Sequence, residues 1–281
     1  MTPSAVGIDV GLLERRGLDV VALDSSRQIL EYARRIRSLQ TLIRIVEALA
    51  PDVVCIDSPS QWAYPGTRRP AEVELTRRGI NLYTTPSEDR AGPFHRWMQD
   101  GFRVFDALAP AYPRYTGGDV RGTAAEYYPH ASAVALRGQI GDFDDKLQFR
   151  RQLLEEQGID ASKLVDGDQV DAALGALTGL IALEGQHSWV GQGKDAMLLP
   201  VTELPAKFER VPALAAPAGV KSTPALPTLS KERMPCLCGC GGIPAGRNSR
   251  FLPGHDNRLN PTTGRRWNGL AGPHSGVTRK T

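Results

Sequence analysis

The sequence predicts an α/β fold built on a mixed sheet, in which three antiparallel strands are followed by a helix and a fourth strand. Three apolar runs separated by short turns predict the antiparallel strands, at residues 4–10, 18–23 and 28–32. A helix is predicted after Ser38, a suitable N-cap, because apolar residues recur there at helical spacing until Pro51. Residues 53–57 are apolar up to Asp57, which is typical of a strand buried on both faces beside the first one.

The remaining elements follow from the same patterns. Residues 58–122 are rich in Pro, Arg and aromatic residues and predict an insertion over the sheet edge, with short helices at 71–78 and 94–108. Later segments predict a strand at 123–128, an amphipathic helix at 146–157, a long core helix at 168–184 and a short strand or arm at 197–201. We therefore expect one large α/β domain over residues 1–206.

Composition limits the class of protein. A chain of 281 residues is long enough for one substantial domain plus an appendage. Its 41% hydrophobic and 23% charged residues are ordinary for a soluble globular protein. Its apolar runs are too short to span a membrane, and the first residues lack the pattern of a signal peptide. We expect a cytoplasmic protein with no membrane partner.

Charge is unevenly distributed along the chain. Residues 1–220 carry 24 Lys and Arg against 29 Asp and Glu, whereas residues 221–281 carry 10 against 2. A basic tail on an acidic body favours a polyanionic partner, most simply DNA or RNA. The alternative is a basic tail that is merely solvated and disordered.

Carboxylates in apolar segments are the most informative feature of the chain. Asp9 and Asp57 end two predicted strands, and Asp168 and Asp171 lie at the start of the long core helix. A carboxylate in apolar surroundings is costly unless it is paired or holds a metal, and Mg²⁺ or Mn²⁺ prefers such hard oxygen ligands. Asp171 is the favoured inward ligand, since Asp168 suits an N-cap equally well. Asp9 and Asp57 could instead be turn or capping residues.

The strand–strand–strand–helix–strand order, with Asp on the first and fourth strands, resembles the ribonuclease H-like fold. Five motifs in the same order also resemble domain-of-unknown-function family 429, over about residues 4–203: Gly7-Ile8-Asp9, Ile56-Asp57-Ser58-Pro59, Arg77-Arg78-Gly79-Ile80, Glu126-Tyr127-Tyr128-Pro129-His130 and Asp171-Ala172. That family is grouped with predicted nucleases. The resemblance implies a two-metal site with Asp9, Asp57, Glu126 and Asp171, or Asp168, as catalytic carboxylates. Glu126 could instead pair with an arginine of the insertion.

Other basic side chains have less specific patterns. His130 fits a surface residue, an acid/base helper or a phosphate contact. Lys146, Arg150 and Arg151 lie along one predicted helix, where they could hold a backbone phosphate or form a solvated face.

The C-terminal region has its own organisation: a linker at 207–231, a cysteine-rich module at 232–259 and a basic, disordered tail at 260–281. Cys236, Cys238, Cys240 and His255 form a ligand set for Zn²⁺, although the usual CxxC spacing is absent. Arginines around these ligands, and Trp267, would help to hold nucleic acid. The alternative is a redox-sensitive, disordered tail.

Three functions compete on this basis. The first is a metal-dependent nuclease, a hydrolase that cleaves phosphodiester bonds. The second is a non-catalytic nucleic-acid-binding or scaffold protein that retains the fold. The third is a phosphotransferase of the actin and sugar-kinase type, but the required later Asp-x-Gly-x-Gly repeat is missing. The sequence fixes no oligomeric state, although a homodimer would suit a junction-cutting relative of this fold.

Overall fold

The computed structural model describes residues 4–141 and 146–211. The expected zinc ligands Cys236, Cys238, Cys240 and His255 lie outside the described residues, as do most of the expected linker and the basic tail.

Within the described part of the chain, no helix has both the length and the apolar character needed to cross a bilayer.

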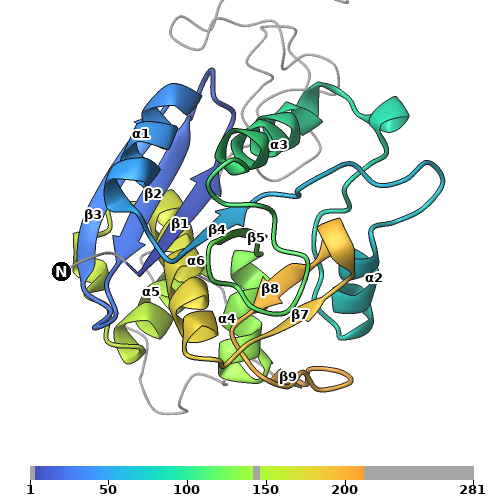
Figure 1. Ribbon diagram of the computed structural model, residues 1–281. Helices are drawn as coiled ribbons and strands as arrows, with labels where there is room; N and C mark the ends of the chain where they lie inside the picture. Colours follow the sequence, from blue (N-terminus) through green and yellow to red (C-terminus); the bar gives the residue numbers. More distant parts are fainter. Residues whose placement is uncertain (1–3, 142–145, 212–281) are drawn as a thin grey trace, which may run out of the picture. The chain divides into compact units, whose positions relative to one another are not determined.

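A seven-stranded mixed sheet forms the centre of the domain, in the order β3-β2-β1-β4-β5-β8-β7 (Figure 1). Its strands are β1 (Ala5–Val10), β2 (Leu18–Leu23), β3 (Ile29–Ile36), β4 (Val53–Asp57), β5 (Thr123–Glu126), β7 (Ser188–Val190) and β8 (Met197–Leu199). The first three strands are antiparallel, whereas β1, β4, β5 and β8 run parallel. This is the predicted ribonuclease H-like arrangement. A separate parallel pair joins β6 (Ile140–Gly141) to β9 (Arg210–Val211).

Helices cover both faces of the sheet (Figure 1). One face carries α1 (Leu39–Leu49) and α3 (Arg96–Leu108), and the other carries α4 (Pro129–Arg137), α5 (Lys146–Glu156) and α6 (Gly167–Leu183). Helix α2 (Pro70–Arg77) contacts β7 at the sheet edge. Within the described residues, four short 3₁₀ helices complete the elements, at Glu88–Arg90, Pro93–His95, Ala161–Lys163 and Gly193–Asp195.

The pleat of β1 separates its side chains between the two faces. Val6, Ile8 and Val10 pack in the same apolar cluster as α1 and α3. Gly7 and Asp9 alternate with them and therefore face α6. A Cβ atom on Gly7 would lie 1.9 Å from the backbone oxygen of Ala172, so only glycine lets α6 approach β1 this closely.

The elements that were predicted occur in the structure with shifts at a few boundaries, whereas α4 and the short strands β6, β7 and β9 were not predicted. Helix α4 was not predicted; Pro129 does not simply end the preceding strand but occupies the first turn of a helix, where its missing N–H has no consequence. The N-cap of α1 is Ser38, as expected, and accepts a hydrogen bond from the N–H of Thr41. The N-cap of α6 is Asp166, however, so Asp168 lies in the first turn and does not cap the helix.

Candidate metal centre

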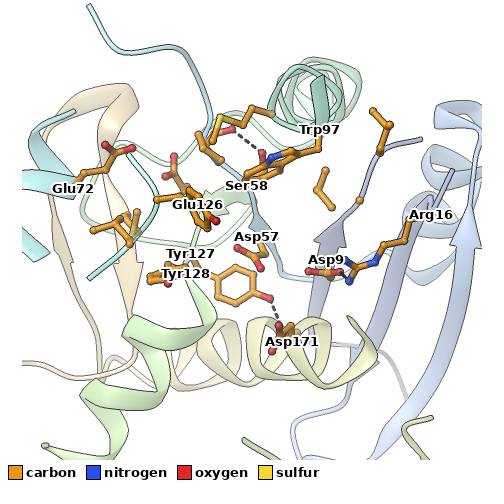
Figure 2. A pocket seen from close by; sticks show the side chains of 18 of the residues that line it. Asp9, Arg16, Asp57, Ser58, Glu72, Trp97, Glu126, Tyr127, Tyr128 and Asp171 are labelled. Atoms are coloured by element: carbon orange, nitrogen blue, oxygen red, sulfur yellow. Dashed lines mark hydrogen bonds and ion pairs between the residues drawn. The ribbon is translucent and has the colours of Figure 1, made fainter. Parts of the chain in front are cut away.

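Three aspartates from three elements converge at one end of the sheet (Figure 2). Asp9 and Asp57 pair directly across the parallel strands β1 and β4, so both side chains lie on the α6 side. Asp171 approaches from α6, and one carboxylate oxygen of each residue lies within 4.8 Å of the others. We call Asp9, Asp57 and Asp171 the carboxylate cluster.

Tyr127 fixes the position of α6 beneath the cluster. Its hydroxyl donates a hydrogen bond of 2.5 Å to the backbone oxygen of Asp171 (Figure 2). The ring lies against Gly175, where a Cβ atom would be 2.5 Å from the ring. Tyr127 therefore holds α6 at two points: the backbone oxygen of Asp171 and, one helical turn further along, Gly175.

Two arginines pair with members of the cluster. Nη1 of Arg150 lies 2.6 Å from Oδ2 of Asp171, and Nη2 of Arg16 lies 3.1 Å from Oδ2 of Asp9. Arg16 also forms an ion pair with Asp168. Asp57 has no salt bridge among the described residues, although the charge of Arg150 acts on it and opposes the rise that burial causes in its pKa.

Burial and mutual repulsion raise the pKa values of the cluster. Burial, followed by the charges of Asp9 and Asp171, holds the pKa of Asp57 well above its usual range. Burial, followed by the charge of Asp171, raises the pKa of Asp9 to about 7, although Arg16 opposes this shift. Burial also raises the pKa of Asp171, against the opposing charge of Arg150. A cation at the centre would relieve this repulsion.

A second group of carboxylates shares Asp9 with the cluster. Asp9, Asp19 and Asp168 also bring one oxygen each within 4.8 Å of one another. Asp19 pairs with Asp9 across β1 and β2, is buried, and its Oδ1 has no hydrogen-bond partner within the described residues. Sequence reasoning missed Asp19, although an aspartate inside the apolar run 18–23 was a visible signal.

Glu126 lines the same pocket as the carboxylate cluster but lies outside the cluster itself. It pairs in register with Ile56 rather than with Asp57, so its side chain leaves the sheet on the other face. There Nη1 of Arg69 lies 2.8 Å from its Oε1, and the N–H of Ser60 donates to its Oε2 over 2.9 Å. The structure therefore contains the alternative left open by the sequence, a pair between Glu126 and an arginine of residues 58–122.

The carboxylate cluster opens into a pocket of about 590 Å³. Four aromatic side chains besides Tyr127 line it, and we call them the aromatic wall: Tyr83, Phe94, Trp97 and Tyr128. Tyr83 and Phe94 are 73% and 61% exposed, and their ring centroids lie 5.8 Å apart. Arg15 and Arg16 also line this pocket. Residues 58–122, which the sequence predicts to be an insertion rich in Pro, Arg and aromatic residues, thus supply most of the aromatic wall.

The other basic residues singled out in the sequence have different positions. Arg150 pairs with Asp171, as described above. Arg151 donates to the backbone oxygens of Ala161 and Leu164 and therefore holds a turn together. His130 and Lys146 line a second, smaller pocket.

Comparisons with known proteins place this geometry in context. A family model described as a protein of unknown function (DUF429) matches residues 7–195. No curated protein matches the chain.

Two solved structures of RuvC from Thermus thermophilus are similar to it. One is RuvC in complex with a Holliday junction substrate, with 16% identity over 69% of this chain and 98% of that chain and a TM-score of 0.37. The other is RuvC alone, with 18% identity over 69% and 99% of the two chains and the same TM-score. These values are too low for the likeness to carry functional information.

Proposed function

We propose that this chain, which belongs to the DUF429 family, is a metal-dependent nuclease that hydrolyses phosphodiester bonds of nucleic acid. The observation that carries the proposal is the convergence of Asp9, Asp57 and Asp171 in one pocket. The three carboxylates come from two strands and a helix, and a bound cation would relieve the repulsion between them.

The residues of the cluster suit a divalent ion of the Mg²⁺ or Mn²⁺ type. All three ligands are hard carboxylate oxygens, which these ions prefer over nitrogen or sulfur. Asp57 has no salt bridge within the described residues, and Asp9 is common to both carboxylate groups. Asp9, Asp57 and Asp171 would therefore hold the ion, with Asp19 and Asp168 beside them. When bound, such ions activate water and stabilise developing charge in phosphodiester hydrolysis.

The protein's own residues orient the cluster and receive the substrate. Arg150 and Tyr127 hold Asp171 through its carboxylate and its backbone oxygen, respectively. Glu126 forms a buried ion pair with Arg69 and accepts a hydrogen bond from the N–H of Ser60. This contact positions the segment that follows Asp57. We assign Glu126 this positioning role rather than that of a ligand.

The walls of the pocket support nucleic acid as the substrate. Exposed aromatic rings stack on bases whatever their sequence, and Tyr83 and Phe94 present two such rings beside the cluster. Arg15 and Arg16 line the same pocket and would attract the phosphate backbone. We extend the proposal to the C-terminal region. There Cys236, Cys238, Cys240 and His255 would bind Zn²⁺, and the basic tail would increase the affinity for nucleic acid.

A cleavage assay tests the proposal. Labelled single-stranded and double-stranded DNA, RNA, RNA–DNA hybrid and a four-way junction are incubated with Mg²⁺, Mn²⁺ or chelator. We expect cutting by the wild type that requires the metal and is lost in Asp57→Asn. Asp52→Asn is the matched control, because Asp52 precedes the same strand at its other end and pairs with Arg121. Equal cutting by Asp57→Asn and wild type would refute the assignment.

One observation favours a non-catalytic nucleic-acid-binding protein as the second candidate. Arg16 and Arg150 already neutralise Asp9 and Asp171, so the site is partly satisfied by the chain's own cations. In that case the wild type would bind oligonucleotides in chelator with a steep salt dependence and cut none of them with any metal.

A further inference from the structure

A second pocket shares Tyr128 with the pocket of the carboxylate cluster. Its volume is about 210 Å³, and it is lined by polar and basic side chains that include Asn81, His130, Lys146 and Arg210. Of the described residues that line it, none carries a carboxylate. We call it the basic pocket.

The positive charge of the basic pocket is not neutralised within the described residues. Lys146 and Arg210 are exposed, and neither forms a salt bridge with another described residue. Burial, together with the charges of Arg150, Lys146 and Arg210, lowers the pKa of His130 to about 4. The imidazole is therefore neutral at pH 7 and can donate one N–H.

The first turn of α4 contributes to the same pocket. Helix α4 has nine residues, and Tyr128 and His130 at its start both line the pocket. Pro129, the first residue of the helix, has no N–H, and no side chain caps this end, so the N–H groups of His130 and Ala131 have no partner in the helix or in a cap. The partial positive charge at a helix N-terminus favours an anion there.

We propose that the basic pocket binds a phosphate group. Lys146 and Arg210 would supply the charge, and the neutral imidazole of His130 and the N–H groups of α4 would supply hydrogen bonds. The chemistry suits a phosphate in general, whether it belongs to a nucleic acid strand or to free phosphate.

The position of the pocket favours a strand as the source. Tyr128 lines both pockets, and Arg150 pairs with Asp171 while its charge acts on His130. A strand that crosses the carboxylate cluster could therefore place a neighbouring phosphate in the basic pocket. This part of the inference rests on the proposed function, whereas the phosphate site itself does not.

A phosphate titration of the full chain tests the site. Chelator is present throughout, so that no cation can bridge phosphate to the carboxylate cluster, and ionic strength is held constant. The imidazole ¹⁵N signals of His130, assigned with His130→Gln, report binding. We expect a saturable shift whose affinity falls about tenfold or more in Lys146→Ala and in Arg210→Ala, since each removes a charged hydrogen-bond donor from the ligand.

Lys163→Ala is the matched control, because Lys163 is an exposed lysine that contacts Asp160 instead of the pocket. It should bind phosphate like the wild type. The proposal is overturned if phosphate gives no saturable shift, or if Lys146→Ala and Arg210→Ala bind as the wild type does.

A second arm identifies the source of the phosphate. Affinity for a single-stranded oligonucleotide is measured in chelator over a range of salt concentrations. If a strand phosphate occupies the pocket, Lys146→Ala lowers the slope of log K against log salt by about 0.7. An unchanged slope, with phosphate binding intact, overturns the strand assignment. Failure of the nuclease proposal appears separately, as absence of cleavage by the wild type.

Discussion

Asp9 and Asp57 face each other because β1 and β4 pair them directly and the pleat sends both side chains towards α6. Glu126 lies one strand further along but pairs with Ile56. A shift of one residue in a strand moves a side chain to the opposite face of the sheet. The side chain of Glu126 therefore contacts Arg69 and does not join the cluster. At the scale of the residue, strand register decides which carboxylates can share a cation.

Asp57→Asn should stabilise the metal-free protein while it removes activity. Asp9 and Asp57 have higher pKa values in the folded protein than their ordinary value of 3.8. Their contribution to folding stability is therefore complete below pH 3.8. It is lost as the pH rises through the pKa of the folded state, which is about 7 for Asp9. Removing one charge relieves this loss. In chelator, the excess in melting temperature of Asp57→Asn over wild type should therefore grow from pH 4 to pH 7.

The cleavage rate of the same variant should fall by more than about 100-fold. Loss of a residue that only orients a metal ligand usually costs about 10- to 100-fold, and loss of a ligand itself should cost more. Mg²⁺ should raise the melting temperature of the wild type more than that of Asp57→Asn. An unchanged or lowered melting temperature of the variant at pH 7 in chelator would contradict the repulsion that we infer.

Glu126→Ala should destabilise the protein without changing its affinity for the metal. Arg69 is only 2% exposed, and loss of its partner leaves a buried charge that costs about 3 kcal/mol, the lower end of the usual range because Asp195 also contacts Arg69. Chemical denaturation measures the first effect, and calorimetric titration with Mn²⁺ measures the second. Loss of Mn²⁺ binding by a stable, folded variant would instead make Glu126 a ligand.

At the scale of the element, the close contact between α6 and β1 delivers Asp171 to the two strand-end aspartates. The backbone oxygen of Ala172 occupies the space in which a Cβ atom of residue 7 would lie. Gly175 and Tyr127 form a similar close contact one turn further along. Small residues in the helix and in the strands therefore set how far Asp171 reaches into the cluster.

Gly7→Ala should move α6 away from the sheet and weaken both fold and site. Overpacking usually costs about 1–3 kcal/mol, and a contact with rigid backbone belongs at or above the top of that range. Gly92→Ala is the control, since nothing lies within 4 Å of a Cβ atom there. Thermal melting and Mn²⁺ affinity should both decrease for Gly7→Ala alone, and equal values for the two variants would refute this role of Gly7.

The segment between β4 and β5 is the second element that shapes the site, because it carries most of the aromatic wall. Phe94→Ala should weaken binding of single-stranded oligonucleotides by about 1–3 kcal/mol, the usual contribution of one stacked base. Tyr64→Ala is the matched control, since Tyr64 is 77% exposed but lines a different pocket. Fluorescence anisotropy in chelator separates binding from cleavage, and equal affinities for both variants would exclude stacking on Phe94.

At the scale of the whole molecule, the described apolar clusters lie within residues 5–208, and residues 1–216 form one compact unit. This unit contains the carboxylate cluster and both pockets of the proposed site. The basic residues of the C-terminal region lie beyond it in the sequence. Folding and metal binding should therefore depend on the first unit, and long-range attraction of nucleic acid on the remainder.

A chain ended at Ala216 should fold and should still be stabilised by Mg²⁺. The full chain should bind single-stranded nucleic acid more tightly, and its log K should fall more steeply with log salt, by about 0.7 for each additional phosphate contact. Melting curves and binding isotherms of the two chains measure these effects. Identical salt slopes would show that the basic tail does not contact the strand.

The sequence by itself determined the order of the first strands and helix, the long core helix and the identity of the strand-end aspartates. Hydrophobic periodicity is a local property, so strands 4–10, 18–23 and 53–57 and the long apolar helix could be read directly from the residues. Asp9, Asp57 and Asp171 stood out because a charge inside an apolar run needs a reason. Helix α4 escaped prediction because a proline that ends a strand can equally begin a helix.

Only the tertiary structure decided which charged groups meet. The register between β4 and β5, which are distant in the sequence, excluded Glu126 from the cluster, and the register between the neighbouring strands β1 and β2 brought Asp19 beside Asp9. The close approach of α6 to Gly7, the aromatic wall and the basic pocket all join segments far apart in the chain. Local patterns carry no information on such contacts, because the packing of the whole domain fixes them.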